Sequence, residues 1–482
     1  MSAPNVVLVM SDQHRADLMG CAGASPGVHT PTLDWLASTG TRFSNVSCQG
    51  PLCMPARASF LTERYVRDHG VYTNWAAVDA ASPTYLWSLR EAGYHTALLG
   101  KAHLYDDAGT NHVRERAPVL EALGFAEVFE TGDKFVSMTT PYTDMLAARG
   151  LLDDYMKHIA EHSYHGENET GRGATKSRPM WDASPAPLPL DAFVDVWHGD
   201  RAAEWIASYD RDEPFFLFVG FPGPHDPWDA PAESRATDDD IVMPASTQRP
   251  DVAAAGTYGR LLKAFLTLSD TETMTDRAIA DMRRAYSANV SLIDAAVGRI
   301  VDALRARELL DDTWIIYTSD HGEMGGDHGL MSKCVLYRQS VRVPLIMRPP
   351  GGGSPAVVDD LVEHVDVASS VRALADGSPL AGSEGRSLLG HLGIGDVPTP
   401  RPVSVSENWG FAVFDTGSHR LVVDEDAMTA CQLFDVRSDP TEDHNLVADP
   451  TVADALGSLM EDVVAPFFRS RPARPHPSPF TA

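Results

Sequence analysis

The chain contains 482 residues, of which 43% are hydrophobic, and it carries a formal net charge of −28 at pH 7. This length accommodates one large α/β domain with a smaller one, and the apolar content supplies a full core. The acidic balance argues against nucleic acid and anionic membranes as partners, because no basic surplus is available to neutralise phosphates. An anionic substrate would need a locally positive pocket.

The cysteines and the N-terminus indicate where the protein works. Five cysteines without metal-finger spacing disfavour a disulfide framework and favour a reducing compartment. The first residues lead directly into the apolar run 6–10, without the regions of a signal peptide, and no window approaches a membrane span. The sequence therefore predicts a soluble, cytoplasmic protein.

The first elements bring polar residues to a strand end. Residues 6–10 form a continuous apolar run, which is typical of a central parallel strand that is buried on both faces. The following Asp12 and Gln13 would lie at the carboxyl edge of the sheet, where α/β folds place ligands. Next, we predict a helix from Pro31, a strand over 43–48 and a helix over 58–62.

The middle of the chain repeats this arrangement. Strands are predicted over 94–100, 214–221, 314–318 and 343–347, and helices over 85–92, 276–306 and 366–374. Polar residues follow three of these strands, namely Lys101 and His103, then His225, then Asp320 and His321. We interpret the less regular ranges 105–195 and 229–275 as insertions over the active-site face, where such segments set specificity.

The pattern changes near residue 400. Short alternating segments such as 403–406 predict a small antiparallel sheet. A closing helix is expected over 452–467, followed by a Pro-rich tail. We therefore predict an α/β fold, with a central, mostly parallel sheet flanked by helices in residues 1–395. A C-terminal subdomain with an antiparallel sheet is predicted in residues 396–482.

The polar groups at these strand ends predict a divalent-metal site. Asp12, Gln13 and Asp320 offer the oxygen ligands that a hard cation prefers. His321 adds a nitrogen ligand, which makes Mn²⁺ a competitor to Ca²⁺. For any single aspartate at a strand end, a helix cap or a turn is the simpler explanation. The prediction therefore depends on the whole set.

The segment 51–62 carries the most specific motif. Taken alone, Cys53 would be explained as a buried thiol, the usual role of a free cysteine. Pro55 and Arg57 follow it at a spacing that resembles the Cys-x-Pro-x-Arg signature of type I sulfatases, in the alkaline phosphatase superfamily. The resemblance implies that a formylglycine-generating enzyme oxidises Cys53 to formylglycine before folding. It also implies that the hydrated aldehyde is the nucleophile and that Arg57 stabilises it.

Further residues match motifs of the same family. The resemblance implies that Lys101 holds the hydrated aldehyde and the sulfate, and that His103 is the base that breaks the intermediate. His225 and Lys333 correspond to sulfate-binding and leaving-group acid residues. Asn74 resembles a residue that contacts substrate, with a turn asparagine as an equal alternative.

The resemblance covers most of the chain apart from the two insertions, and it implies an alkaline-phosphatase-like fold. Gln13 and His321 look more like the choline-sulfatase and phosphonate monoester hydrolase branches. Ca²⁺ is favoured as the metal, with Mn²⁺ or Mg²⁺ as alternatives. Two positions depart from the pattern: Ala56 stands where many sulfatases have Ser, and Glu63 stands where Gly is usual.

These features lead to two enzymatic hypotheses. The first is hydrolysis of a small sulfate ester by the formylglycine hydrate with a divalent metal, which releases inorganic sulfate. The second is a phosphonate monoester or phosphodiester hydrolase with the same nucleophile, which Gln13, Asn74 and His321 favour. Lys101 and His103 favour sulfate. A non-catalytic metal-binding protein is a third hypothesis, and the nearly complete polar set argues against it. The expected partners are the small anionic ester and the maturing enzyme, and a homo-oligomer is compatible with the sequence.

Overall fold

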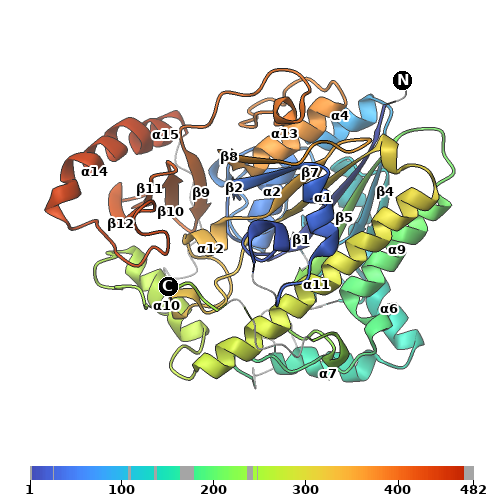
Figure 1. Ribbon diagram of the computed structural model, residues 1–482, viewed down its shortest axis with the longest axis horizontal. Coiled ribbons are helices and arrows are strands. Elements are labelled where there is room, and N and C mark those ends of the chain that lie inside the picture. The colour runs from blue at the N-terminus through green and yellow to red at the C-terminus, as the bar shows by residue number, and fades with distance from the viewer. Residues whose placement is uncertain are drawn as a thin grey trace.

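Strand β1 (Asn5–Asp12) is completely buried and lies inside an eight-stranded sheet in the computed structural model of the chain (Figure 1). The structure describes residues 3–24, 27–106, 110–134, 138–162, 178–235, 241, 243–246 and 248–471. The strand order is β4-β3-β5-β1-β6-β7-β2-β8, and every neighbouring pair is parallel except the two that contain β7. The predicted α/β fold with a mostly parallel sheet is confirmed.

The strands beside β1 carry the ligand-bearing edge. The other strands are β2 (Thr41–Ser47), β3 (His95–Gly100), β4 (Glu127–Glu130), β5 (Phe215–Pro224), β6 (Thr313–Ser319), β7 (Leu345–Arg348) and β8 (Ala356–Glu363). Because β5 and β6 flank β1 and run parallel to it, the carboxyl ends of all three strands meet at one edge of the sheet.

Alternate side chains of β1 enter two different cores. Val7 and Val9 pack with residues of α1, α9 and α11, whereas Val6 and Leu8 pack with residues of α2, α4 and α13. These helices are α1 (Pro31–Ser38), α2 (Cys53–Thr62), α4 (Tyr85–Glu91), α9 (Val194–Ser208), α11 (Asp276–Ala306) and α13 (His364–Leu374). Figure 1 shows α9 and α11 side by side, and the two pack against each other. A continuous apolar strand is therefore required at β1, because both of its faces are covered.

A four-stranded antiparallel sheet forms the C-terminal subdomain, in the order β12-β11-β10-β9. Its elements are β9 (Ser404–Asn408), β10 (Phe411–Asp415), β11 (His419–Asp424), β12 (Thr429–Asp435), α14 (Ala453–Leu459) and α15 (Ala465–Ser470). The backbone N–H of Glu407 donates to the oxygen of Gln49 at 2.8 Å, and Arg67 of α3 (Val66–His69) forms ion pairs with Glu407 and Glu425. The small sheet thus supports the loop that leads to Cys53.

The two ranges interpreted as insertions contain regular structure. Residues 105–195 supply β4, the edge strand of the large sheet, and helices α5 (Ala117–Ala122), α6 (Pro141–Ala148) and α7 (Leu152–His162). Residues 229–275 contain α10 (Tyr258–Leu268), whose buried Leu261, Leu262 and Phe265 lie at helical spacing.

Several further elements differ from the prediction, and helices α3 and α9 were not predicted. Helix α2 begins at Cys53 rather than at residue 58. Strand β8 was not predicted, because most of its side chains are exposed or half-buried at the sheet edge. A short helix, α12 (Arg338–Val341), precedes β7.

The Pro-rich end of the tail, 472–482, lies outside the described residues. Within the described part of the chain, no helix has the length and apolarity to cross a bilayer.

Candidate active site

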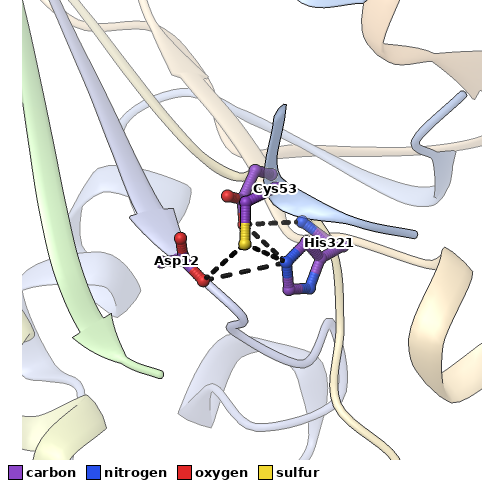
Figure 2. Close-up of side chains that lie close together, drawn as sticks. Asp12, Cys53 and His321 are labelled. Atoms are coloured by element: carbon purple, nitrogen blue, oxygen red, sulfur yellow. Dashed lines mark hydrogen bonds and ion pairs between the residues drawn. The ribbon is translucent and has the colours of Figure 1, made fainter. Parts of the chain in front are cut away.

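Cys53 lies at the N-terminus of α2, and its thiol points at the carboxyl edge of the large sheet (Figure 2). The residue is only 1% exposed. Its Sγ lies 3.2 Å from His321 Nε2 and 3.8 Å from Asp12 Oδ1. Burial acts to raise the pKa of the thiol, but Lys333, Lys101 and His321 outweigh it and hold the pKa of Cys53 well below its ordinary value.

Two aspartates reach the same point because β1 and β6 are parallel neighbours, with Ser11 opposite Ser319. Asp12 ends β1 and Asp320 follows β6. Arg57, one turn into α2, joins them: its Nε donates to Asp320 Oδ2 at 2.8 Å, and its Nη2 donates to Asp12 Oδ2 at 3.3 Å. Burial and the charge of Asp12 raise the pKa of Asp320, so a bound cation would relieve the repulsion between the two carboxylates.

Among the described residues, one group of His, Cys, Asp and Glu side chains has the spacing of a metal site. It consists of Asp12, Cys53, Asp320 and His321, and their ligand atoms lie within 4.8 Å of one another. The Oδ1 atoms of both aspartates lie 3.7 Å from His321 Nε2. Carboxylate oxygens with one imidazole nitrogen suit a divalent cation. The residues present therefore fit the predicted metal.

Gln13 lies beside this group with a φ of 69°. Its backbone N–H donates to Asp320 Oδ1 at 3.0 Å, and its Oε1 accepts from Lys333 Nζ at 2.6 Å. Its Nε2 donates to Asp226 Oδ1 at 3.3 Å and to Glu323 Oε2. These two acceptors fix the carboxamide with its oxygen toward Lys333, and ligation of the metal by Gln13 stays a prediction.

Lys101 and His103 follow β3 at the same edge. The Lys101 side chain is fully buried, and its Nζ donates to Asp12 Oδ2 at 2.5 Å and also to Asp133. His103 is half-buried and has a φ of 53°. Its Nδ1 is buried and has no hydrogen-bond partner in the described part of the chain. That nitrogen is available to a substrate or a proton, as the predicted base requires.

His225 follows β5 and contacts Lys333 through its Nε2. Both side chains are buried. Burial and Lys333 act to lower the pKa of His225. The neighbouring carboxylates, led by Asp226 and Asp133, outweigh them and raise the pKa of His225 to about 9. The imidazole therefore holds a proton more strongly than an ordinary histidine does, which suits a group that acts as an acid.

Asn74 caps the helix that carries Cys53. Its Oδ1 accepts from the backbone N–H of Met54 at 3.0 Å, so it satisfies one of the free donors in the first turn of α2. This contact gives Asn74 a structural role, and a substrate contact stays a prediction.

Three acidic residues of the site were missed by sequence reasoning. Asp133 contacts Lys101, and Glu130 accepts from the backbone N–H of Ala102 at 2.8 Å. Both lie in a range interpreted as an insertion, where no motif marks them. Glu323 accepts from the backbone N–H of Ser332 at 2.6 Å and so holds the loop to Lys333. Its place in the motif after Asp320 was the only available signal.

The structure explains the unusual Glu63. This residue ends α2 in the left-handed conformation, with a φ of 56°, which favours glycine. Its buried carboxylate accepts from Arg372 Nε of α13 at 2.8 Å and from the hydroxyl of Ser383. The departure from the family pattern thus ties the end of the helix to its neighbour.

A buried thiol at a helix N-terminus, beside residues that could hold a divalent cation and several cationic side chains, is the combination expected of a hydrolase of anionic esters. A family model described as sulfatase matches residues 4–378, so the chain belongs to the sulfatase family. The resemblance drawn from the motifs is thereby confirmed.

Relatives and solved structures agree with this assignment. The multifunctional alkaline phosphatase superfamily protein PehA of Trinickia caryophylli is 28% identical over 94% of this chain and 93% of the relative. The choline-sulfatase of Rhizobium meliloti (strain 1021) is 28% identical over 93% of this chain and 83% of the relative. The phosphonate monoester hydrolase of Agrobacterium radiobacter superposes with a TM-score of 0.78 at 24% identity, covering 96% of this chain and 95% of that one. The expected alkaline-phosphatase-like fold is confirmed.

Proposed function

We propose that this sulfatase-family enzyme hydrolyses a small sulfate ester and releases inorganic sulfate, with formylglycine at position 53 and a divalent metal. The observation that supports the proposal most strongly is the buried group of Asp12, Cys53, Asp320 and His321, whose ligand atoms lie within 4.8 Å of one another. Ca²⁺ is the favoured metal, and Mg²⁺ is an alternative, because most of the candidate ligand atoms are oxygens. Mn²⁺ is a second alternative because His321 adds a nitrogen ligand.

The proposed chemistry divides among groups already described. When bound, the metal withdraws charge from the ester oxygens, and the hydrated aldehyde at position 53 offers a hydroxyl as nucleophile. Arg57 holds the two aspartates in place, and Lys101 binds the anionic end of the substrate. His225 or Lys333 gives a proton to the leaving oxygen.

His103 completes the proposed cycle. When sulfate leaves, the remaining hydroxyl at position 53 loses its proton and becomes the aldehyde, which one water molecule then hydrates to restore the nucleophile. We assign the removal of this proton to His103, whose Nδ1 has no hydrogen-bond partner among the described residues. His103 therefore acts after the ester bond is broken, so its loss should affect turnover more than substrate binding.

Mass spectrometry of the tryptic peptide 43–57 tests the nucleophile. This peptide contains Cys48 as well as Cys53, so Cys48 serves as an internal control. In protein made together with a formylglycine-generating enzyme, we expect an aldehyde at position 53 and an intact thiol at position 48. An active preparation with two intact thiols would contradict the proposal.

A matched pair of variants tests the same point by activity. Cys53→Ala should abolish turnover of an aryl sulfate, because no nucleophile remains. Cys48→Ala changes another buried thiol of the same loop region and should retain turnover. Equal loss of turnover in both variants would indicate a packing effect instead.

A phosphonate monoester or phosphodiester hydrolase is the second candidate. Gln13 and His321 beside the proposed metal favour it, and the phosphonate monoester hydrolase of Agrobacterium radiobacter shares the fold. The ratio of kcat/KM for an aryl sulfate and an aryl phosphodiester, measured on one matured preparation, decides between the two. A larger value for the phosphodiester would reverse the proposed order.

A further inference from the structure

Asp133 is an acidic residue that contacts Lys101, the side chain proposed to bind the anionic end of the substrate. It follows β4, and its side chain is 23% exposed. Its Oδ2 accepts from Lys101 Nζ, and its Oδ1 accepts from the backbone N–H of Lys134 at 2.7 Å. Both oxygens are therefore engaged by the protein. This arrangement suits a group that holds Lys101, rather than one that binds a cationic part of the substrate.

The segment that carries Asp133 is fixed on two sides. Glu130 accepts from the backbone N–H of Ala102 at 2.8 Å and from that of Gly132 at 2.9 Å. On the other side, Lys134 Nζ donates to the oxygen of Pro227 and to Asp229 Oδ1, both at 3.2 Å. The residues 130–134 thus join the turn after β3 to the loop after β5. Asp133 therefore lies in a segment that is hydrogen-bonded to both of these loops.

Lys101 has two carboxylate partners of different kinds. Asp12 belongs to the proposed metal group, whereas Asp133 does not. A cation bound by Asp12 would share the charge of that carboxylate and weaken its attraction for the Lys101 ammonium. A fully buried ammonium needs a counter-charge to keep its position. Asp133 supplies one that the metal does not occupy.

We propose that Asp133 is a positioning residue, which holds the ammonium of Lys101 where it binds the anionic end of the ester. The inference rests on the proposed function, because it assigns Lys101 to that anionic end. It adds a residue that no motif marks, from a part of the chain that sequence reasoning treated as an insertion.

The proposal is tested by whether Asp133→Asn makes the protein bind inorganic sulfate more weakly or more tightly. The measurement is equilibrium binding to the matured, metal-loaded protein, with Asp133→Asn compared with wild type. If Asp133 acted only through its negative charge, its removal would make sulfate bind more tightly. If it positions Lys101, sulfate should bind about tenfold more weakly, because one charge-assisted hydrogen bond loses its geometry. Unchanged or tighter binding would overturn the proposal.

A second background makes the test specific to Lys101. In Lys101→Met protein the ammonium is absent, so Asp133→Asn should then strengthen sulfate binding or leave it unchanged. The same weakening in both backgrounds would show that Asp133 does not act through Lys101. Asp144→Asn, an identical change at an exposed position of α6, is the matched control and should bind sulfate as wild type does.

Two further results keep the outcome decisive. Asp133→Glu preserves the negative charge, so this variant should bind sulfate more tightly than Asp133→Asn does. Equally weak sulfate binding in the two variants would overturn the proposal. Wild-type protein that binds neither dication nor sulfate would overturn the proposed function and this inference together. Wild-type binding of both, with no change in Asp133→Asn, would overturn this inference alone.

Discussion

The guanidinium of Arg57 contacts three different strand ends. Besides its bonds to Asp12 and Asp320, its Nη1 donates to the backbone oxygen of Lys101 at 2.8 Å. A planar fork of donors can serve three acceptors in fixed directions, which an ammonium on a flexible stem cannot do. Arg57 therefore fixes the relative positions of β1, β3 and β6 at the point where the ester would bind.

Arg57→Lys keeps the charge and removes this fork. We expect kcat/KM for an aryl sulfate to fall roughly 100-fold, because the two carboxylates lose their common donor and shift. Arg64→Lys is the matched control, since Arg64 is bonded through Nη2 to the backbone of Ala381 outside the site. Retention of wild-type kcat/KM in Arg57→Lys would contradict the bridging role.

Glu63→Gly sets two effects against each other. Glycine adopts the left-handed backbone without steric strain, which stabilises the folded state by about 1 kcal/mol. It also leaves Arg372, which is 5% exposed, without its carboxylate, and breaking a buried ion pair costs about 3–5 kcal/mol. We expect the free energy of unfolding in urea to fall by about 2–4 kcal/mol. A stabilised Glu63→Gly variant would show that the family glycine is better here.

Among the elements, α2 concentrates the functions of the site. Its first residue is Cys53, Arg57 lies one turn further on, Asn74 caps its N-terminus, and Glu63 anchors its end. The motif spacing made the first two predictable, because both are local in sequence. The cap and the anchor depend on partners from other elements, so only the structure shows them.

Strands and helices differ in how well the sequence predicts them. The central strands β1, β5 and β6 are buried on both faces and carry continuous apolar runs, so their positions were predicted closely. Strands β4 and β8 are the edges of the sheet and carry mixed side chains. Because neither strand has a continuous apolar run, their sequences look like those of loops. Asp133 follows one of these edges, which is why it was missed.

The end of β4 makes a pH-dependent contribution to stability. Burial raises the pKa of Glu130 from its ordinary value of 4.5 to about 7. The folded protein thus keeps a proton that the unfolded chain loses, so this contribution is complete below pH 4.5 and disappears as the pH rises through 7.

Glu130→Gln, which cannot titrate, should reduce the fall in unfolding temperature between pH 4.5 and pH 8. Thermal unfolding at several pH values provides the measurement. Glu127→Gln, on the exposed part of the same strand, should leave the slope unchanged. An identical slope in wild type and Glu130→Gln would show that Glu130 is already ionised.

On the scale of the whole molecule, the proposed metal joins parts of the chain that are distant in sequence. Asp12 ends β1, Asp320 follows the neighbouring strand β6, and Cys53 begins a helix on one face of the sheet. Binding a dication to the folded state alone stabilises that state by about 2.7 kcal/mol at 100 times the dissociation constant. The fold and the proposed metal site should therefore respond together.

We expect chelation to lower the unfolding temperature of wild-type protein, and added Ca²⁺ or Mn²⁺ to restore it. Asp320→Asn should remove most of this response, because it deletes one of the two carboxylates that are proposed to hold the ion. Calorimetry on the same preparations measures both effects. A full response in Asp320→Asn would place the stabilising ion elsewhere.

The near-complete burial of Cys53 has a consequence for how active protein is obtained. Once the chain has closed around this thiol, a second enzyme cannot reach it, so the proposed oxidation would compete with folding in each newly made molecule. Conditions that slow the closing of the chain, such as growth at lower temperature, should raise the aldehyde fraction. Treating purified, native thiol protein with the maturing enzyme should leave it unchanged. The specific activity of a preparation would then depend on the conditions under which the protein was made, and later treatment of the purified protein would not change it.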